Sequence, residues 1–172
     1  MNQAEHAPRV VFAHGKESGP WGSKIRHLAA IAEAAGCAVD SPDYSAMMDP
    51  LERLRHLETL APAGTPLLLV GSSMGGYVSA MACAALRPAA LLLMAPALYL
   101  EGYPGEPRDC PADTVVVHGW HDDIVPLSAS LDFARARSAA LHIVDDGHRL
   151  ADSLDLIGAL FQRQLERALG HR

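Results

Sequence analysis

Short apolar runs alternate with longer amphipathic segments along the chain. Each run is four to seven residues long and is bounded by turn residues, which is typical of buried strands. Six strands are therefore predicted, at residues 9–13, 37–41, 66–70, 89–95, 114–118 and 141–144. Strands that alternate with helices build parallel sheets covered on both faces, so we expect a three-layer α/β/α sandwich with a mostly parallel sheet.

The segments between the strands carry helix start and stop signals. An apolar stripe predicts a helix over residues 23–35, which Gly36 ends in the left-handed conformation. Asp49 is the expected N-cap of a second helix, with Pro50 at its first position and an apolar stripe of Leu51, Leu54 and Leu57. Two further helices are predicted at residues 76–87 and from about Leu150.

A chain of 172 residues suits one domain that builds a core without disulfides or metals. We therefore expect residues 1–172 to form a single domain. The one long irregular connection is residues 96–113, rich in proline, glycine and tyrosine. It is the candidate for a rim or small lid, and it is too short for a separate cap domain.

Charge and cysteine content narrow the function classes. The net charge is −6 and no Lys/Arg cluster occurs, which argues against a nucleic-acid surface and favours a small-molecule partner. Cys37, Cys83 and Cys110 lack C-x-x-C spacing, so neither a disulfide framework nor a zinc site is expected, and reduced thiols point to the cytoplasm.

No membrane span or export signal is expected from the hydropathy of the chain. The longest apolar run, residues 89–100, is far shorter than a span and contains Pro96. The first eight residues are polar and lack an apolar signal core.

The most specific chemical signal is a serine between two glycines at the end of a strand. The apolar residues 67–70 run directly into Gly71-Ser72-Ser73-Met74-Gly75, which has the G-x-S-x-G spacing of a nucleophile elbow. The glycines leave room for a sharp strand-to-helix turn, and only Ser73 has glycine on both sides at this spacing. Ser73 is therefore the predicted nucleophile, and the Met74 amide that follows is a predicted oxyanion donor.

A serine nucleophile needs a base and a carboxylate that holds the base. His148 follows the last predicted strand, at the sheet edge where catalytic groups of α/β proteins gather. Asp122 and Asp123 follow the strand 114–118, and the carboxylates at 145 and 146 are further candidates, each more typical of a turn cap. Serine, then acid, then histidine is the chain order found in the α/β-hydrolase architecture.

Three segments together resemble the α/β-hydrolase superfamily, and in particular its small, nearly lidless serine esterases. They are the elbow at Ser73, the H-G-x-x-D-x-x-V-P segment at residues 118–126, and the late Gly147-His148 pair. The resemblance implies a reduced α/β-hydrolase fold with strand order 2-1-3-4-5-6. It also implies that Asp122, four residues after His118, is the acid of the triad.

The turn after the first strand looks like the superfamily's H-G-x oxyanion loop. The resemblance implies that the Lys16 amide is the second oxyanion donor, with its side chain free to point outward. His14 then packs beneath the loop and Gly15 permits its turn. A lysine departs from the apolar residue that is common at this place.

Two other interpretations of these segments are weaker. The glycine-rich turn at residues 14–19 has neither the Walker nor the dinucleotide-binding spacing, so no nucleotide site is predicted. His118 and His121 beside two carboxylates resemble a zinc site, but the acid role explains the segment with fewer assumptions. The histidines outside these motifs are expected to be structural or exposed, namely His6, His27, His56, His142 and His171.

The sequence thus predicts a serine hydrolase that needs no cofactor or metal. Its expected substrate is a small or short-acyl ester or thioester, bound in an open cleft bordered by Trp21, Tyr99, Tyr103 and Trp120. Two alternatives stay open: a non-catalytic binding protein on the same scaffold, and an acyltransferase or thioesterase that uses the same triad.

Overall fold

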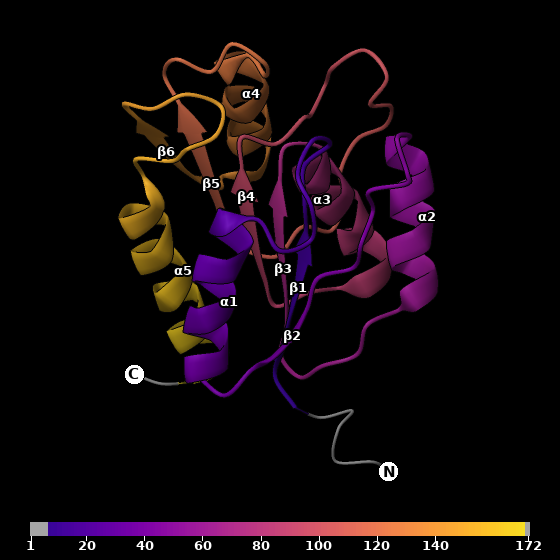
Figure 1. The fold of residues 1–172 in the computed structure, drawn as a ribbon, viewed down its shortest axis with the longest axis vertical. Coiled ribbons are helices and arrows are strands. Elements are labelled where there is room, and N and C mark those ends of the chain that lie inside the picture. Colours follow the sequence, from indigo (N-terminus) through magenta and orange to yellow (C-terminus); the bar gives the residue numbers. More distant parts are fainter. Residues whose placement is uncertain (1–6, 171–172) are drawn as a thin grey trace.

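A six-stranded, all-parallel sheet forms the centre of the molecule. The computed structural model describes residues 7–170, and the strands lie in the order β2-β1-β3-β4-β5-β6 (Figure 1). They are β1 (Arg9–Ala13), β2 (Ala38–Asp40), β3 (Leu67–Ser72), β4 (Ala90–Met94), β5 (Asp113–Gly119) and β6 (Ala140–Val144). The predicted fold class, strand number and strand order are confirmed.

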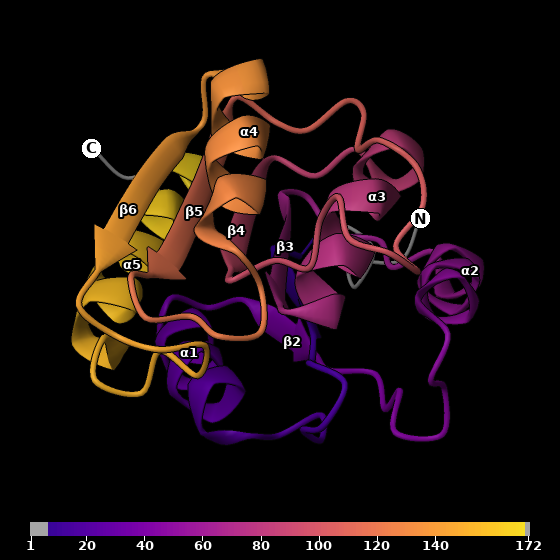
Figure 2. The ribbon, with the colours of Figure 1, turned by 90° about the horizontal axis from the view of Figure 1, so that it is seen from above.

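Five helices cover the two faces of the sheet. They are α1 (Ser23–Ala34), α2 (Pro50–Leu60), α3 (Met74–Leu86), α4 (Leu127–Arg137) and α5 (Leu154–Ala168). Seen from above, α1 and α5 lie on one face, whereas α2, α3 and α4 lie on the other (Figure 2). This is the three-layer α/β/α sandwich that the alternating pattern predicts.

Each face of the sheet has its own apolar core. Phe12 of β1 packs with Phe161 of α5 on one face, with the ring centroids 6.4 Å apart. On the other face, Leu91 of β4 packs with Tyr77 of α3 and Phe133 of α4. Because alternate residues of a strand point to opposite faces, both sides of the central strands are apolar, which explains their continuous hydrophobic runs.

Two helices differ from the sequence-based expectation. Helix α4 is absent from the prediction, because its buried side is only Ala129, Ser130, Phe133 and Ala134, a weak apolar stripe. Helix α5 begins four residues later than predicted, at Leu154, since Leu150 adopts a left-handed φ of 53°.

Helix α2 begins as predicted but also buries a residue outside the predicted apolar stripe. The Asp49 carboxylate accepts a hydrogen bond from the Leu51 amide at 3.0 Å, as expected of an N-cap. Leu57 of the expected stripe is buried, and Leu51 and Leu54 are half-buried. Arg53, which the stripe does not include, is buried as well. A charged side chain thus enters the interior next to the carboxyl edge of the sheet.

Candidate active site

The turn between β3 and α3 is a strained strand-to-helix connection centred on Ser73. Ser73 has φ 54° and ψ −118°, a conformation that non-glycine residues rarely adopt. A Cβ atom on Gly71 would overlap the Gly75 carbonyl, and one on Gly75 would overlap the carbonyl of Ala13. The two glycines of the motif are therefore required by close backbone approach, as the sequence analysis predicts.

Backbone hydrogen bonds hold this turn against β4. The Ser73 amide donates to the Met94 carbonyl at 2.9 Å, and the Ala97 amide donates to the Ser73 carbonyl at 3.0 Å. Both bonds fix the position of the serine without using its hydroxyl. The hydroxyl is left to face the loop that carries His148.

Three predicted side chains form one continuous hydrogen-bonded chain. His148 Nε2 lies 3.0 Å from Ser73 Oγ, and His148 Nδ1 lies 2.8 Å from Asp122 Oδ2. The imidazole is 18% exposed and the Asp122 carboxylate only 1% exposed. The carboxylate makes Nδ1 the protonated nitrogen, so that Nε2 is free to accept the serine proton.

Asp122 is held by donors on its own loop. Its Oδ1 accepts hydrogen bonds from the amides of Ile124 at 2.9 Å and Val125 at 2.8 Å. These bonds leave Oδ2 directed at His148. The neighbouring Asp123 is exposed, and no hydrogen bond or ion pair of its side chain occurs among the described residues.

The other two candidate acids have local structural roles. Asp146 caps the turn before α5, because its Oδ2 accepts from the Asp152 amide and the Ser153 hydroxyl, each at 2.9 Å. Asp145 pairs with His121 on the surface at 2.8 Å. Neither carboxylate contacts the imidazole of His148.

A buried histidine at the end of β5 supports the Asp122 loop. His118 Nε2 donates to the Val125 carbonyl at 3.0 Å and lies 3.2 Å from Asp122 Oδ2, while Nδ1 accepts from the Ser130 hydroxyl at 2.7 Å. Burial lowers the pKa of His118 below its ordinary value, so the ring is neutral at pH 7. His118 and His121 therefore have different hydrogen-bond partners.

The turn after β1 approaches the elbow closely. A Cβ atom on Gly15 would lie 3.6 Å from Ser73 Cβ, so this loop passes directly beside the serine. His14 is fully buried beneath the loop, and the side chain of Lys16 is exposed. The burial of His14 and the outward position of Lys16 agree with the sequence analysis, and the donor role of the Lys16 and Met74 amides stays a prediction.

Sequence analysis missed the polar cluster beneath this loop. Arg53 of α2 is fully buried and donates from Nη1 to the His14 carbonyl at 2.8 Å and to the Gly15 carbonyl at 3.3 Å. Its guanidinium lies 5.5 Å from the ring centroid of Tyr44, which is also fully buried. The sequence does not indicate that Arg53 is buried, because a charged residue in an amphipathic helix normally faces solvent.

The four aromatic residues predicted to border the cleft have different surroundings. Trp21, Tyr99 and Trp120 are exposed, at 43%, 40% and 60%. The Tyr99 hydroxyl donates to Glu106 and accepts from Arg137, whereas Tyr103 is half-buried and packs edge-on against Tyr77. Their contact with a substrate stays a prediction.

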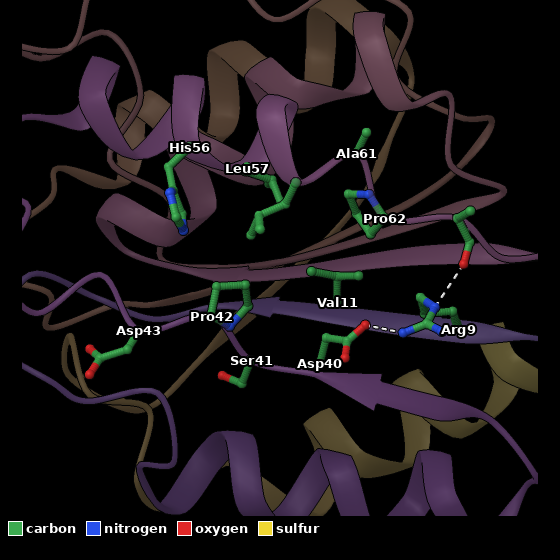
Figure 3. A pocket seen from close by; sticks show the side chains of 12 residues that line it. Arg9, Val11, Asp40, Ser41, Pro42, Asp43, His56, Leu57, Ala61 and Pro62 are labelled. Carbon is green, nitrogen blue, oxygen red and sulfur yellow. Dashed lines mark hydrogen bonds and ion pairs between the residues drawn. The ribbon is translucent and has the colours of Figure 1, made fainter.

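A cavity of about 560 Å³ lies between α2 and the edge strand β2 (Figure 3). Leu57 and His56 line its helix side, and Ser41 and Pro42 line its strand side. Arg9 bridges Asp40 and the Ala63 carbonyl at one end. Ser73, Asp122 and His148 do not line this cavity, so it is separate from the hydrogen-bonded chain.

The histidines outside the motif segments lie in different surroundings. His27 lies against Gly158 of α5, His56 packs edge-on against Tyr44, and His142 is half-buried in β6. His6 and His171 lie outside the described residues. Within residues 7–170, every helix is too short or too polar to cross a bilayer.

A parallel α/β/α sandwich with a serine on a strained β3–α3 turn defines the α/β-hydrolase class of proteins. The model of the alpha/beta hydrolase family matches residues 10–114, which is more than half of the chain. The chain therefore belongs to the alpha/beta hydrolase family. No match was found among the curated proteins.

Solved structures agree with this assignment. A protein of the alpha/beta hydrolase superfamily from Xanthomonas campestris is 34% identical, with a TM-score of 0.84 and coverage of 93% of this chain and 99% of that one. An α/β serine hydrolase without a lid from the same species is 25% identical, with a TM-score of 0.63 and coverage of 94% and 83%. Est1E from Butyrivibrio proteoclasticus shares the fold at 18% identity, with a TM-score of 0.79 and coverage of 96% and 90%.

Proposed function

We propose that this hydrolase is a serine esterase that cleaves a carboxylic ester or thioester through an acyl-enzyme on Ser73. The observation that carries the proposal is the unbroken chain from Ser73 through His148 to the buried Asp122. Hydrogen-bonded contact of nucleophile, base and carboxylate is the arrangement that activates a serine hydroxyl at neutral pH.

In the proposed first step, Ser73 Oγ attacks the carbonyl carbon while His148 Nε2 takes the hydroxyl proton. His148 then gives this proton to the leaving alcohol or thiol, and the acyl group stays on Ser73. Water attacks the acyl-enzyme in the second step, with His148 again accepting and returning the proton. Asp122 keeps its charge throughout and stabilises the imidazolium.

The negative oxygen of each tetrahedral intermediate is assigned to the backbone amides of Met74 and Lys16. The approach of the Gly15 turn to Ser73 supports this assignment, because it brings the loop within reach of an oxygen on the attacked carbon. Loss of one such donor typically costs about 10²- to 10³-fold in turnover.

A short acyl chain is the proposed substrate feature. Residues 96–112 of the predicted 96–113 connection contain neither helix nor strand, and Asp113 already begins β5; this supports an open rim rather than a cap domain. Exposed Trp21 and Trp120 offer apolar surface that suits a small acyl group. The proposed compartment is the cytoplasm, since Cys37, Cys83 and Cys110 are free thiols in the structure.

The test is covalent labelling together with turnover of a short p-nitrophenyl ester. We expect a fluorophosphonate to label Ser73 stoichiometrically and Ser73→Ala to reduce turnover to background. Ser72→Ala is the matched control, because Ser72 is the adjacent buried serine and should retain both properties. Full activity in Ser73→Ala would overturn the proposal, and unlabelled, folded wild-type protein would favour a non-catalytic binding protein.

A thioesterase or acyltransferase would pass the labelling test, because both form the same acyl-enzyme. The enzyme classes are separated by comparing esters and thioesters of matched acyl length, with water or an added alcohol as acceptor. We expect the highest kcat/KM for short-chain esters with water. Faster product formation with the alcohol acceptor would instead assign an acyltransferase.

A further inference from the structure

Arg53 is a fully buried cation whose hydrogen bonds all go to backbone carbonyls. Nε donates to the Met47 carbonyl at 2.8 Å, and Nη1 donates to the carbonyls of His14 and Gly15. Nη2 has no hydrogen-bond partner among residues 7–170. Within the same residues, no carboxylate lies within ion-pair distance of the Arg53 guanidinium. Burial of an unpaired charge is costly, so the fold retains this guanidinium against a large desolvation penalty.

The carbonyl of Gly15 belongs to the same peptide group as the amide of Lys16. The oxygen of this peptide group therefore faces Arg53, and the N–H of the same group is the proposed oxyanion donor. The Gly15 carbonyl also accepts a hydrogen bond from His14 Nδ1 at 2.7 Å. The Ser18 hydroxyl is a third, longer donor to the same oxygen at 3.5 Å. Three donors thus converge on the oxygen of one peptide group, and the shorter two come from His14 and Arg53.

The tautomer of His14 is fixed by its other nitrogen. The Tyr44 amide donates to His14 Nε2 at 2.9 Å, so Nε2 carries no proton and Nδ1 is the donor toward Gly15. Burial lowers the pKa of His14, and the nearby Arg53 charge acts in the same direction, so the ring stays neutral. A neutral histidine and a charged arginine therefore share the same acceptor peptide.

Hydrogen bonds that end on the oxygen of a peptide group polarise it and make its N–H a stronger donor. They also fix the plane of the peptide, and hence the direction of the N–H. The positive charge of Arg53 further stabilises a negative charge that develops on the other side of this peptide. All three effects act on the transition state, where the substrate oxygen becomes negative, more than on the bound ester.

We infer that Arg53 is a positioning residue that orients and polarises the Gly15–Lys16 peptide for stabilisation of the oxyanion. This inference rests on the proposed function, since it assigns a task within the same reaction. Arginine suits the task better than lysine because its planar group bridges two carbonyls from one fixed position, whereas an ammonium group is a point charge.

The test uses Arg53→Met, which removes the charge and the donors, and Arg53→Lys, which keeps the charge alone. Arg167→Met is the matched control, since Arg167 pairs with Asp113 at the opposite edge of the sheet. We expect Arg53→Met to lower kcat about 10- to 30-fold with KM within about threefold, as for an interaction made in the transition state. Arg53→Lys should lose less, and Arg167→Met should keep the wild-type values.

A spectroscopic measurement separates this role from a general effect on folding. A trifluoromethyl ketone with a ¹³C-labelled carbonyl forms a hemiketal with a reactive serine. The ¹³C chemical shift of the hemiketal carbon, followed as a function of pH, gives the pH at which the hemiketal oxygen ionises. We expect this pH to rise by about one unit in Arg53→Met and by less in Arg53→Lys, because a nearby cation favours the ionised oxygen. Thermal unfolding of each variant verifies that the protein measured is folded.

The outcomes distinguish this inference from the proposed function. If wild-type protein forms no hemiketal, the serine-hydrolase proposal itself fails. If hemiketals form in the wild type and in Arg53→Met and ionise at the same pH, or if kcat is unchanged, the role of Arg53 is overturned. Should Arg53→Met not fold, Arg53→Gln takes its place with the same readouts and the same criteria.

Discussion

The carboxyl edge of the sheet carries two buried His-Gly turns that differ in the charged groups packed around them. His118-Gly119 at the end of β5 lies under the loop of Asp122, and His14-Gly15 after β1 lies under the loop of Lys16. His118 has a neutral hydroxyl and a carbonyl as partners and stands beside a carboxylate. His14 stands beside the buried cation of Arg53, and the nearest carboxylate is that of the exposed Asp43, 3.8 Å from Nε2.

This difference matches the charge that each loop has to support in the proposed reaction. The β5 loop holds a negative carboxylate that stabilises an imidazolium, and its amides supply the compensating donors. The β1 loop has to stabilise a negative charge on the substrate, and a buried cation stands behind it. Two turns with the same residue pair thus acquire opposite electrostatic surroundings from the elements packed against them.

The largest expected effect comes from a change in the β5 loop, at the carboxylate of Asp122. We expect Asp122→Asn to lower kcat by about 10⁴-fold, because the amide no longer holds the productive tautomer of the base. Asp123→Asn should stay within about threefold of wild type, since its exposed side chain makes no contact with His148. Turnover of the same short ester provides the measurement, and the reverse ranking would transfer the acid role to Asp123.

A smaller effect is expected from a change in the β1 loop, at the backbone amide of Lys16. Lys16→Pro removes the backbone N–H, and we expect a loss of about 10²- to 10³-fold in kcat. Lys16→Ala keeps the N–H and replaces only the exposed side chain, so its kcat should remain within about twofold of wild type. Equal losses in the two variants would show that the side chain, and not the amide, is required.

The smallest effect concerns stability at acid pH. The pKa values of His14 and His118 are lowered by burial, so the unfolded chain binds more protons than the native state as the pH falls below 6.5. The free energy of unfolding should therefore decrease below this pH, by up to about 1.4 kcal/mol per pH unit for each histidine. Above it, both rings are neutral in both states and contribute no slope.

The two histidines should differ in this titration. Two charged or titratable groups act on each ring. Near His118 the carboxylate of Asp122, which favours protonation, has the larger effect and His148 opposes it. Near His14 the cation of Arg53, which opposes protonation, has a larger effect than the carboxylate of Asp43. We therefore expect His14→Gln to flatten the dependence of unfolding free energy on pH more than His118→Gln, measured by urea denaturation between about pH 7.5 and 5.5. An equal change in the two variants would contradict the electrostatic contrast between the turns.

Much of the fold, and the residues of the Ser73–His148–Asp122 chain, could be predicted because the sequence patterns that indicate them are local. Buried strands appear as short apolar runs, and β1 is predicted to the residue at Arg9–Ala13. The strained turn at Ser73 requires glycine at fixed spacing, which leaves a visible motif. Helix α4 escaped prediction because its buried side is small and partly polar, so tertiary contacts rather than periodicity define it.

The choice among the acids shows where local signals end. Asp122, Asp123, Asp145 and Asp146 are alike as residue types, so residue type alone does not choose among them. Folding separates them, since one carboxylate faces His148, one is exposed, one pairs with His121 and one caps a turn. The resemblance to a family had already favoured Asp122, and the contacts give the physical reason.

The sequence by itself determined the order of the layers and the serine turn, because strand hydrophobicity and glycine spacing act over a few neighbouring residues. Only the tertiary structure decided that Arg53 turns inward to the His14 and Gly15 carbonyls, 39 and 38 residues away along the chain. In a helix pattern, arginine normally indicates a solvated face. Its burial depends on backbone acceptors that β1 and α2 bring together only when they pack.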